Sequence, residues 1–265
     1  MNRIDEKFQE LRARKKKALV AYLTLGFPDL ETNLAQILEM DRRGVSIIEI
    51  GIPFTDPTAD GPTIQVSSQK ALEAGISLED AFRLARRVRE SSGIPLLLMG
   101  YLNPFLALPP ARLAGKLRSA GIDGLIVPDL PPEEAGRLGR ALSEKHIHLV
   151  FLVAPTSPPE RVRFVARASR GFVYCVSRAG VTGEKGTAAR NLEQLVGEIK
   201  AATKTPVCVG FGISTRTQVE KVEKIADGAI VGSALIKPFL EESSPRTGLK
   251  RTLVRVNELL GNDSQ

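Results

Sequence analysis

The chain of 265 residues is poor in the residue types that build disulfide, metal and imidazole sites. It has no tryptophan, three tyrosines, two cysteines and two histidines. Two cysteines are too few for a disulfide framework or a zinc cluster. A count of only two histidines also argues against a histidine-based triad or a catalytic zinc site. We therefore expect no metal site, and any acid–base chemistry has to use carboxylates, tyrosine or lysine.

Long apolar stretches are missing as well. No run approaches 18 apolar residues, so we expect no segment that spans a membrane. Residues 1–17 carry charges where a signal peptide needs an apolar stretch, which argues against secretion. The two cysteines, Cys175 and Cys208, lie inside apolar runs. Together these features predict a protein of the reducing cytoplasm.

The net charge of +7 comes from 37 Lys and Arg against 30 Asp and Glu. A basic balance is compatible with nucleic acid or with a phosphorylated small substrate. No aromatic residues alternate with the basic ones as stacking platforms, however. Solvated helix faces are therefore the preferred interpretation, and no nucleic-acid partner is expected. The basic segments are residues 12–17, 83–89 and 161–170.

Eight short apolar runs, rich in β-branched residues, recur along the chain. Each is nearly continuous in apolar content, which is typical of strands buried on both faces of a parallel sheet. Amphipathic stretches with helical spacing lie between the runs, and one more, marked by Ile4, Phe8 and Leu11, precedes the first. The runs cover residues 19–25, 45–51, 95–100, 124–127, 149–154, 172–177, 206–210 and 229–232.

This alternation of eight strands and helices is typical of a (β/α)8 TIM barrel of the α/β class. We predict one barrel domain over residues 1–265, with an extra N-terminal helix. The segment between the second and third runs is longer than the others, so an insertion is expected after strand 2. A doubly wound open sheet is the alternative, but no GxGxxG follows an early strand, which removes its commonest dinucleotide-binding form.

A glutamate, Glu49, lies inside the second apolar run, near its carboxyl end. Burial of a carboxyl raises its pKa unless it is paired with a cation, and a raised pKa allows proton exchange near neutral pH. Barrel active sites lie at the carboxyl ends of the strands. Glu49 is therefore a candidate catalytic group, the alternative being a structural glutamate paired with Lys or Arg. In the following loop, a turn role is preferred for Asp56, and the role of Asp60 stays open.

The seventh and eighth runs both end in glycine-containing turns, at Gly210 and Gly212 and at Gly232 and Ser233. Glycine lets backbone N–H groups approach an anion, and barrels often bind phosphate after these two strands. The two turns together predict a phosphate site, with tight-turn packing as the alternative. Tyr174, in the sixth run, is either core packing or a site residue, and its hydroxyl needs a partner if buried.

The segment from Glu49 to Gln65 closely resembles the signature of the tryptophan synthase α-subunit family. The resemblance extends over nearly the whole chain, and this first motif is the most specific. It implies a TIM-barrel lyase that cleaves indole-3-glycerol phosphate to indole and glyceraldehyde 3-phosphate in tryptophan biosynthesis, without a cofactor or metal. It also implies a pyridoxal-phosphate β-subunit as partner, in an α2β2 complex. The later motifs that agree in order and spacing are residues 99–104, 127–131, 177–183, 210–214 and 232–234.

The resemblance also implies roles for single residues. Glu49 is expected to protonate indole C3 and to help move the glycerol hydroxyl proton. Asp60 is expected to take or stabilise the indole N–H proton, and Tyr174 to lie near the indole and the glycerol chain. The expected substrate-binding positions are Tyr22, Thr182, Gly183, Gly212, Gly232 and Ser233. The surface expected to face the β-subunit carries Pro53, Asp56, Pro57, Tyr101 and Asn103.

Residues 53–60 and the segment that begins at Arg178 resemble the family's loops that close over the site, where Thr182 would meet Asp60. Two other functions stay open. One is a binding or regulatory subunit that has lost turnover, against which the intact Glu49, Asp60 and Thr182 argue. The other is a different phosphate-binding barrel, such as an isomerase or synthase, which would leave the segment 49–65 unexplained.

Overall fold

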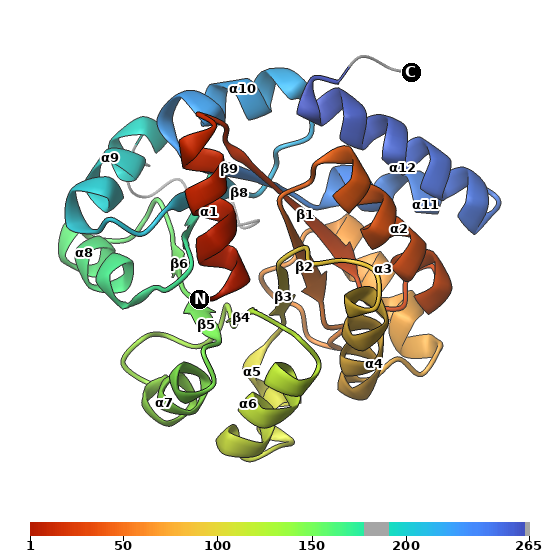
Figure 1. The fold of residues 1–265 in the computed structure, drawn as a ribbon, viewed down its shortest axis with the longest axis horizontal. Coiled ribbons are helices and arrows are strands. Elements are labelled where there is room, and N and C mark those ends of the chain that lie inside the picture. The colour runs from red at the N-terminus through yellow and green to blue at the C-terminus, as the bar shows by residue number, and fades with distance from the viewer. Residues whose placement is uncertain (178–190, 263–265) are drawn as a thin grey trace.

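The computed structural model describes residues 1–177 and 191–262, which form a parallel sheet ringed by helices (Figure 1). The strands pair in the order β5-β4-β3-β2-β1-β9-β8-β7-β6. The outermost two, β5 (His148–Val150) and β6 (Leu152–Val153), are separated in the chain only by Phe151. The sheet therefore closes on itself, and the predicted TIM barrel is confirmed, with β5 and β6 as two halves of the fifth barrel strand.

The break at Phe151 differs from the unbroken run expected over residues 149–154. At the break, the backbone N–H of Phe151 donates to Ser169 Oγ at 3.0 Å, and its carbonyl accepts from the N–H of Tyr174 on β7 at 3.0 Å. The other strands follow the predicted runs closely, and Val176 is their only residue that is not buried, so both faces are covered as the continuous apolar pattern indicated. They are β1 (Ala18–Thr24), β2 (Ile47–Gly51), β3 (Leu96–Met99), β4 (Gly124–Ile126), β7 (Val173–Val176), β8 (Val207–Gly210) and β9 (Gly228–Val231).

The helices form the outer ring in Figure 1, and two of them lie between β2 and β3, which confirms the insertion after strand 2. Within the described residues, no helix is long and apolar enough to cross a membrane. The helices are α1 (Arg3–Ala13), α2 (Leu30–Arg43), α3 (Pro62–Glu73), α4 (Leu78–Arg89), α5 (Leu102–Leu106), α6 (Pro110–Ser119), α7 (Gly136–Glu144), α8 (Pro159–Ala168), α9 (Leu192–Ala202), α10 (Arg216–Ile225), α11 (Ser233–Glu241) and α12 (Pro245–Leu260).

The expected extra helix, α1, covers the N-terminal end of the barrel (Figure 1). Its Ile4 is fully buried, and the Phe8 ring packs on Phe172 with centroids 6.2 Å apart. Asn2 Nδ2 fixes the start of the helix by donating to the carbonyl oxygen of Asp123 at 2.8 Å. Because α1 plugs this end, the carboxyl ends of the strands are left for the site.

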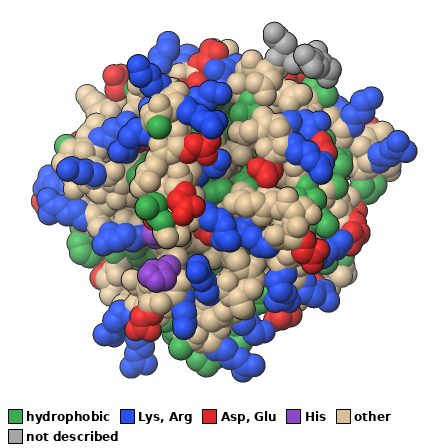
Figure 2. Space-filling view, in the orientation of Figure 1, with side chains coloured by type: hydrophobic (Ala, Val, Ile, Leu, Met, Phe, Trp, Pro, Cys, Tyr) green, Lys and Arg blue, Asp and Glu red, His purple; other side chains and the backbone are tan. Residues whose placement is uncertain are grey.

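The charged side chains on the face that carries α1 are scattered rather than gathered in one patch, with Asp and Glu among the Lys and Arg (Figure 2). Basic side chains of the segments 12–17 and 83–89 pair with carboxylates one helical turn away, as Arg14 does with Glu10 at 3.1 Å and Arg83 with Asp80. This distribution supports the interpretation of the basic segments as solvated helix faces.

Candidate active site

Glu49 points into the barrel from β2, at the level of Tyr22 on β1 and Leu97 on β3. It is fully buried, and within the described part of the chain its two carboxyl oxygens are the only buried side-chain N or O atoms without a hydrogen-bond partner. Burial raises the pKa of Glu49 to about 8, and the nearby charge of Asp60 adds to the effect. The carboxyl is therefore mostly protonated at neutral pH. The structural alternative, in which Glu49 pairs with a Lys or Arg, is therefore wrong, since neither carboxyl oxygen has a partner.

Asp60 lies in the loop between β2 and α3 and is half-buried. The backbone N–H of Asp60 donates to the carbonyl of Pro57 at 3.0 Å, and the backbone carbonyl of Asp60 accepts from Gln65 Nε2 at 2.9 Å. Burial raises the pKa of Asp60 to about 6. The site thus contains two carboxyls whose pKa values lie on either side of neutrality, an arrangement that suits an acid and a base or charge stabiliser.

Two buried tyrosines line the interior beside Glu49, and each is accommodated by a glycine on a neighbouring strand. A Cβ atom at Gly51 would lie 2.0 Å from Tyr22 Oη, and a Cβ atom at Gly210 would lie 2.4 Å from Tyr174 Oη. Burial raises the pKa of both phenols well above 10, and negative charge at Asp60 and Glu49 contributes. Both hydroxyls therefore stay protonated beside the carboxyls.

The roles of Gly51 and Gly210 in making room for these hydroxyls were not anticipated from the sequence. Their position at the last residue of a buried strand was the available signal. A side chain at either position would displace a tyrosine, since real Cβ contacts do not come so close.

The loop that carries Asp60 is held by Tyr101, which follows β3 and begins α5. Tyr101 Oη accepts a hydrogen bond from the backbone N–H of Ala59 at 2.8 Å, and the Tyr101 ring stacks on Phe54 with centroids 5.2 Å apart. Burial, followed by the charge of Asp60, raises the pKa of Tyr101 to about 12. Tyr101 is thus a buried anchor for the loop in the isolated chain.

The other residues expected at a partner surface divide by exposure. Asp56 and Asn103 are exposed and Pro57 is half-buried, whereas Pro53, like Tyr101, is buried. Any contact of a partner with Pro53 or Tyr101 would therefore be transmitted through the exposed loop residues above them.

Ser214 and Thr215, which follow the first glycine turn, and Ser233 and Ala234, which follow the second, line one cavity of about 690 Å³. The glycines themselves do not line it, and side chains of α11 and α12, Glu241 and Glu258 among them, form the rest of its wall. Gly212 has φ +80°, a conformation that favours glycine. The other turn leads into α11, which has no side-chain cap on its N-terminal N–H groups. An uncapped helix N-terminus has the N–H groups and the dipole that suit an anion.

Two expected substrate-binding residues, Thr182 and Gly183, lie outside the described residues, as does the rest of the segment from Arg178 to Arg190.

The histidines and cysteines lie apart from the carboxyl pair or are chemically inert. His148 Nε2 pairs with Asp5 of α1 at 2.9 Å, at the N-terminal end of the barrel. Both cysteines are buried and unbonded, and burial raises the pKa of Cys175 to about 12. No group of three or more His, Cys, Asp or Glu among the described residues could hold a metal ion.

The chain is similar to proteins of a known family. The family model described as tryptophan synthase alpha chain matches residues 8–262. The tryptophan synthase alpha chain of Geobacter sp. (strain M21) is 47% identical over 239 residues, 90% of each chain. That of Chloroflexus aggregans is 43% identical over 261 residues, 98% of this chain and 97% of the relative. The aminoacrylate-bound tryptophan synthase of M. tuberculosis contains a chain that superposes with a TM-score of 0.87 at 37% identity, covering 98% of both chains.

Proposed function

The chain belongs to the tryptophan synthase alpha chain family, and from this premise we propose how its own residues perform the family's reaction. That reaction is the retro-aldol cleavage of indole-3-glycerol phosphate to indole and glyceraldehyde 3-phosphate. The indole passes to a β-subunit, the partner of this chain in tryptophan biosynthesis.

Glu49 supplies the proton that the cleavage needs. Breaking the bond between indole C3 and the glycerol chain requires a proton on C3, so that the bond electrons can return to the ring. A carboxyl with a pKa of about 8 carries that proton at neutral pH. The resulting carboxylate then takes the proton of the glycerol hydroxyl as the aldehyde forms, which returns Glu49 to its starting state. General acid–base groups of this kind contribute roughly 10² to 10⁴-fold in rate.

Asp60 stabilises the ring during the same step. Protonation at C3 places positive charge on the indole, and an ionised carboxylate at the ring N–H offsets it. With a pKa of about 6, Asp60 is mostly ionised at neutral pH. Tyr22 and Tyr174 border the indole with their rings, and their protonated hydroxyls add dipoles near the reacting carboxyls.

The phosphate of the substrate binds at the two glycine turns. Gly212, Gly232 and Ser233 provide backbone N–H groups, a hydroxyl and the N-terminus of α11, and the absence of a side-chain cap on α11 supports this assignment. Thr182 and Gly183 would complete the site from the segment outside the described residues.

The reaction as derived uses only carboxyls, hydroxyls and backbone N–H groups, so we propose that the chain needs no cofactor of its own. Pyridoxal phosphate belongs to the β-subunit. Two buried free cysteines suit a reducing compartment, and we place the chain in the cytoplasm as one functional domain.

The observation that carries this proposal is the fully buried Glu49 carboxyl without a hydrogen-bond partner. The experiment is indole release from indole-3-glycerol phosphate by the purified chain, alone and with a cognate β-subunit. Slow release that rises with the partner is expected. No release in either condition, with glycerol 3-phosphate binding intact, would instead identify a binding subunit that has lost turnover.

A further inference from the structure

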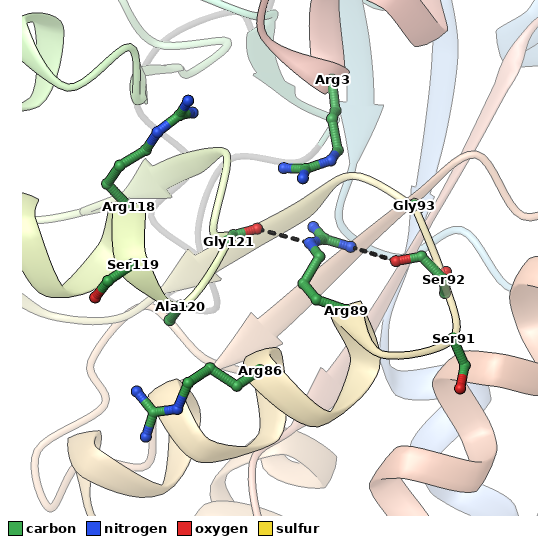
Figure 3. Close-up of a pocket in the computed structure, with 10 residues that line it drawn as sticks. All are labelled: Arg3, Arg86, Arg89, Ser91, Ser92, Gly93, Arg118, Ser119, Ala120 and Gly121. Carbon is green, nitrogen blue, oxygen red and sulfur yellow. Dashed lines mark hydrogen bonds between the residues drawn. The ribbon is translucent and has the colours of Figure 1, made fainter.

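A second polar cavity lies at the N-terminal end of the barrel, where α4 and α6 end and the strands they precede begin (Figure 3). Its volume is about 590 Å³, within the range of small-molecule sites. Four of its ten lining residues are arginines: Arg3, Arg86, Arg89 and Arg118. The others are serine, glycine and one alanine, so the wall offers charge and hydroxyl groups but no aromatic surface.

Two of these arginines are fixed in place by one carboxylate. Asp123, which is buried, accepts from Arg3 at 2.8 Å through one oxygen and from Arg89 at 2.9 Å through the other. Arg89 also donates to the carbonyls of Gly121 at 2.9 Å and Ile94 at 2.6 Å. Figure 3 shows the guanidinium groups of Arg3 and Arg89 next to each other in the cavity. The floor of the cavity is therefore a rigid, pre-organised pair of cations.

The other two arginines are free to bind. Arg86 on α4 and Arg118 on α6 are exposed, and their side chains make no hydrogen bond or ion pair with any residue in the described ranges. They come from two different helices at the rim of the cavity, and the Arg86 side chain extends away from the fixed pair (Figure 3). Their fork of N–H donors suits bidentate recognition of phosphate or carboxylate.

The charges around the cavity do not cancel. Helices α4 and α6 both end at the cavity, and each helix carboxyl end carries about −0.5 charge. This negative charge alone favours arginine in the last turn of a helix. Asp123 adds one negative charge, and Asp41, which accepts from Ser92 Oγ at 2.6 Å, adds another nearby. Four guanidiniums therefore exceed the negative charge of the two helix ends, Asp123 and Asp41 by roughly one unit. Capping of the helix ends does not account for this surplus.

We infer that this cavity binds the phosphate group of a small phosphorylated molecule. A phosphate monoester carries about −1.5 to −2 charge at neutral pH and is therefore attracted to this positive surplus. The serine and glycine wall suits a polar body such as a polyol or sugar, whereas an indole ring would find no apolar surface. The site is therefore separate in place and in ligand preference from the phosphate turns at Gly212 and Gly232.

The test is a titration of the full chain, deuterated and labelled with ¹⁵N, with inorganic phosphate and separately with glycerol 3-phosphate at physiological salt. Amide shifts are followed residue by residue, so binding at Ser119–Gly121 is separated from binding at Gly232 and Ser233. Saturable shifts at Ser119–Gly121 are expected with both probes. Tighter binding of the ester would identify a metabolite as the ligand, and equal binding would identify free phosphate.

The decisive variant is Arg86→Gln with Arg118→Gln, which removes two exposed side chains without leaving a partner unpaired. Affinity at Ser119–Gly121 is expected to fall by about tenfold or more. The matched control is Arg163→Gln with Arg167→Gln, the same charge change at exposed positions of α8, which should leave that affinity unchanged. Absence of saturable shifts at Ser119–Gly121, or an equal loss in the control, would overturn the inference.

Discussion

Tyr101 Oη and the backbone N–H of Ala59 form a hydrogen bond of 2.8 Å that joins the end of β3 to the loop between β2 and α3. The contact falls one residue before Asp60, whose carboxyl is one of the two we assign to catalysis. The stacking of Tyr101 on Phe54 holds the other end of the same loop. The position of Asp60 over the barrel therefore depends on a residue from the next connection, between β3 and α5.

Tyr101→Phe tests this dependence. The variant keeps the ring on Phe54 but leaves the Ala59 N–H without its acceptor, which should cost about 1 kcal/mol in free energy of unfolding. Because Asp60 is then held less firmly, kcat/KM for indole release should fall by about tenfold. Denaturant unfolding and steady-state kinetics measure the two effects. An unchanged kcat/KM beside a loss of stability would limit Tyr101 to a structural role.

Gly210→Ala should displace the Tyr174 ring, because the new Cβ would lie 2.4 Å from the phenol oxygen. We expect a loss of stability of about 1–3 kcal/mol from overpacking and a marked loss of indole release. Gly115→Ala on α6 is the control, since nothing lies within 4 Å of a Cβ there. That change should leave activity intact and stabilise the helix by roughly 0.5–1 kcal/mol. Normal turnover in Gly210→Ala would remove Tyr174 from the site.

Ser233→Asp separates phosphate binding from helix stability. An aspartate in the first turn of α11 interacts favourably with the helix dipole, so stability should hold or rise by a few tenths of a kcal/mol. The same carboxylate would repel the substrate phosphate, and affinity for glycerol 3-phosphate should fall by about tenfold or more. Calorimetric titration of the Ser233→Asp and Ser233→Ala variants with glycerol 3-phosphate measures the two affinities. Equal affinity in the Asp and Ala variants would place the phosphate elsewhere.

Glu49→Gln should abolish turnover and stabilise the fold at alkaline pH. The pKa of Glu49 is raised from 4.5 to about 8 on folding, so the unfolded chain releases this proton first. The wild-type chain therefore loses stability as pH rises from about 4.5 to about 8, and the variant does not. Between pH 5 and pH 8 the difference in free energy of unfolding should change by on the order of 3 kcal/mol in favour of the variant. Denaturant unfolding at the two pH values measures this. A difference between variant and wild type that is the same at pH 5 and pH 8 would contradict the raised pKa.

The barrel could be predicted from the sequence because burial on both faces gives each strand a continuous apolar run. This pattern is visible in each strand separately and does not depend on the sequence of the neighbouring strands. Glu49 stood out for the same reason, as a carboxyl within such a run. The break at Phe151 could not be predicted, since nothing in the run 149–154 indicates that the Phe151 N–H bonds to Ser169, a side chain from a later part of the chain.

The detailed geometry of the site was beyond sequence reasoning for a similar reason. The pKa of Asp60 depends on how deeply its loop is buried, and Tyr101, 42 residues from Ala59, fixes that loop. The contact of Tyr22 on β1 with Gly51 on β2 is made between two strands, and the sequence of neither strand alone indicates it.

The most direct test of the account is the pH dependence of kcat/KM for indole release, in the wild-type chain and in Asp60→Asn. Activity requires Asp60 ionised and Glu49 protonated, so kcat/KM should rise through a pKa near 6 and fall through a pKa near 8. Asp60→Asn should be strongly impaired, lose the acid limb, and show its alkaline limb at lower pH, because the charge that helps raise the pKa of Glu49 is gone. A wild-type profile that is flat from pH 6 to 8, or still rising above 8, would contradict the assignment of Glu49 as the proton donor.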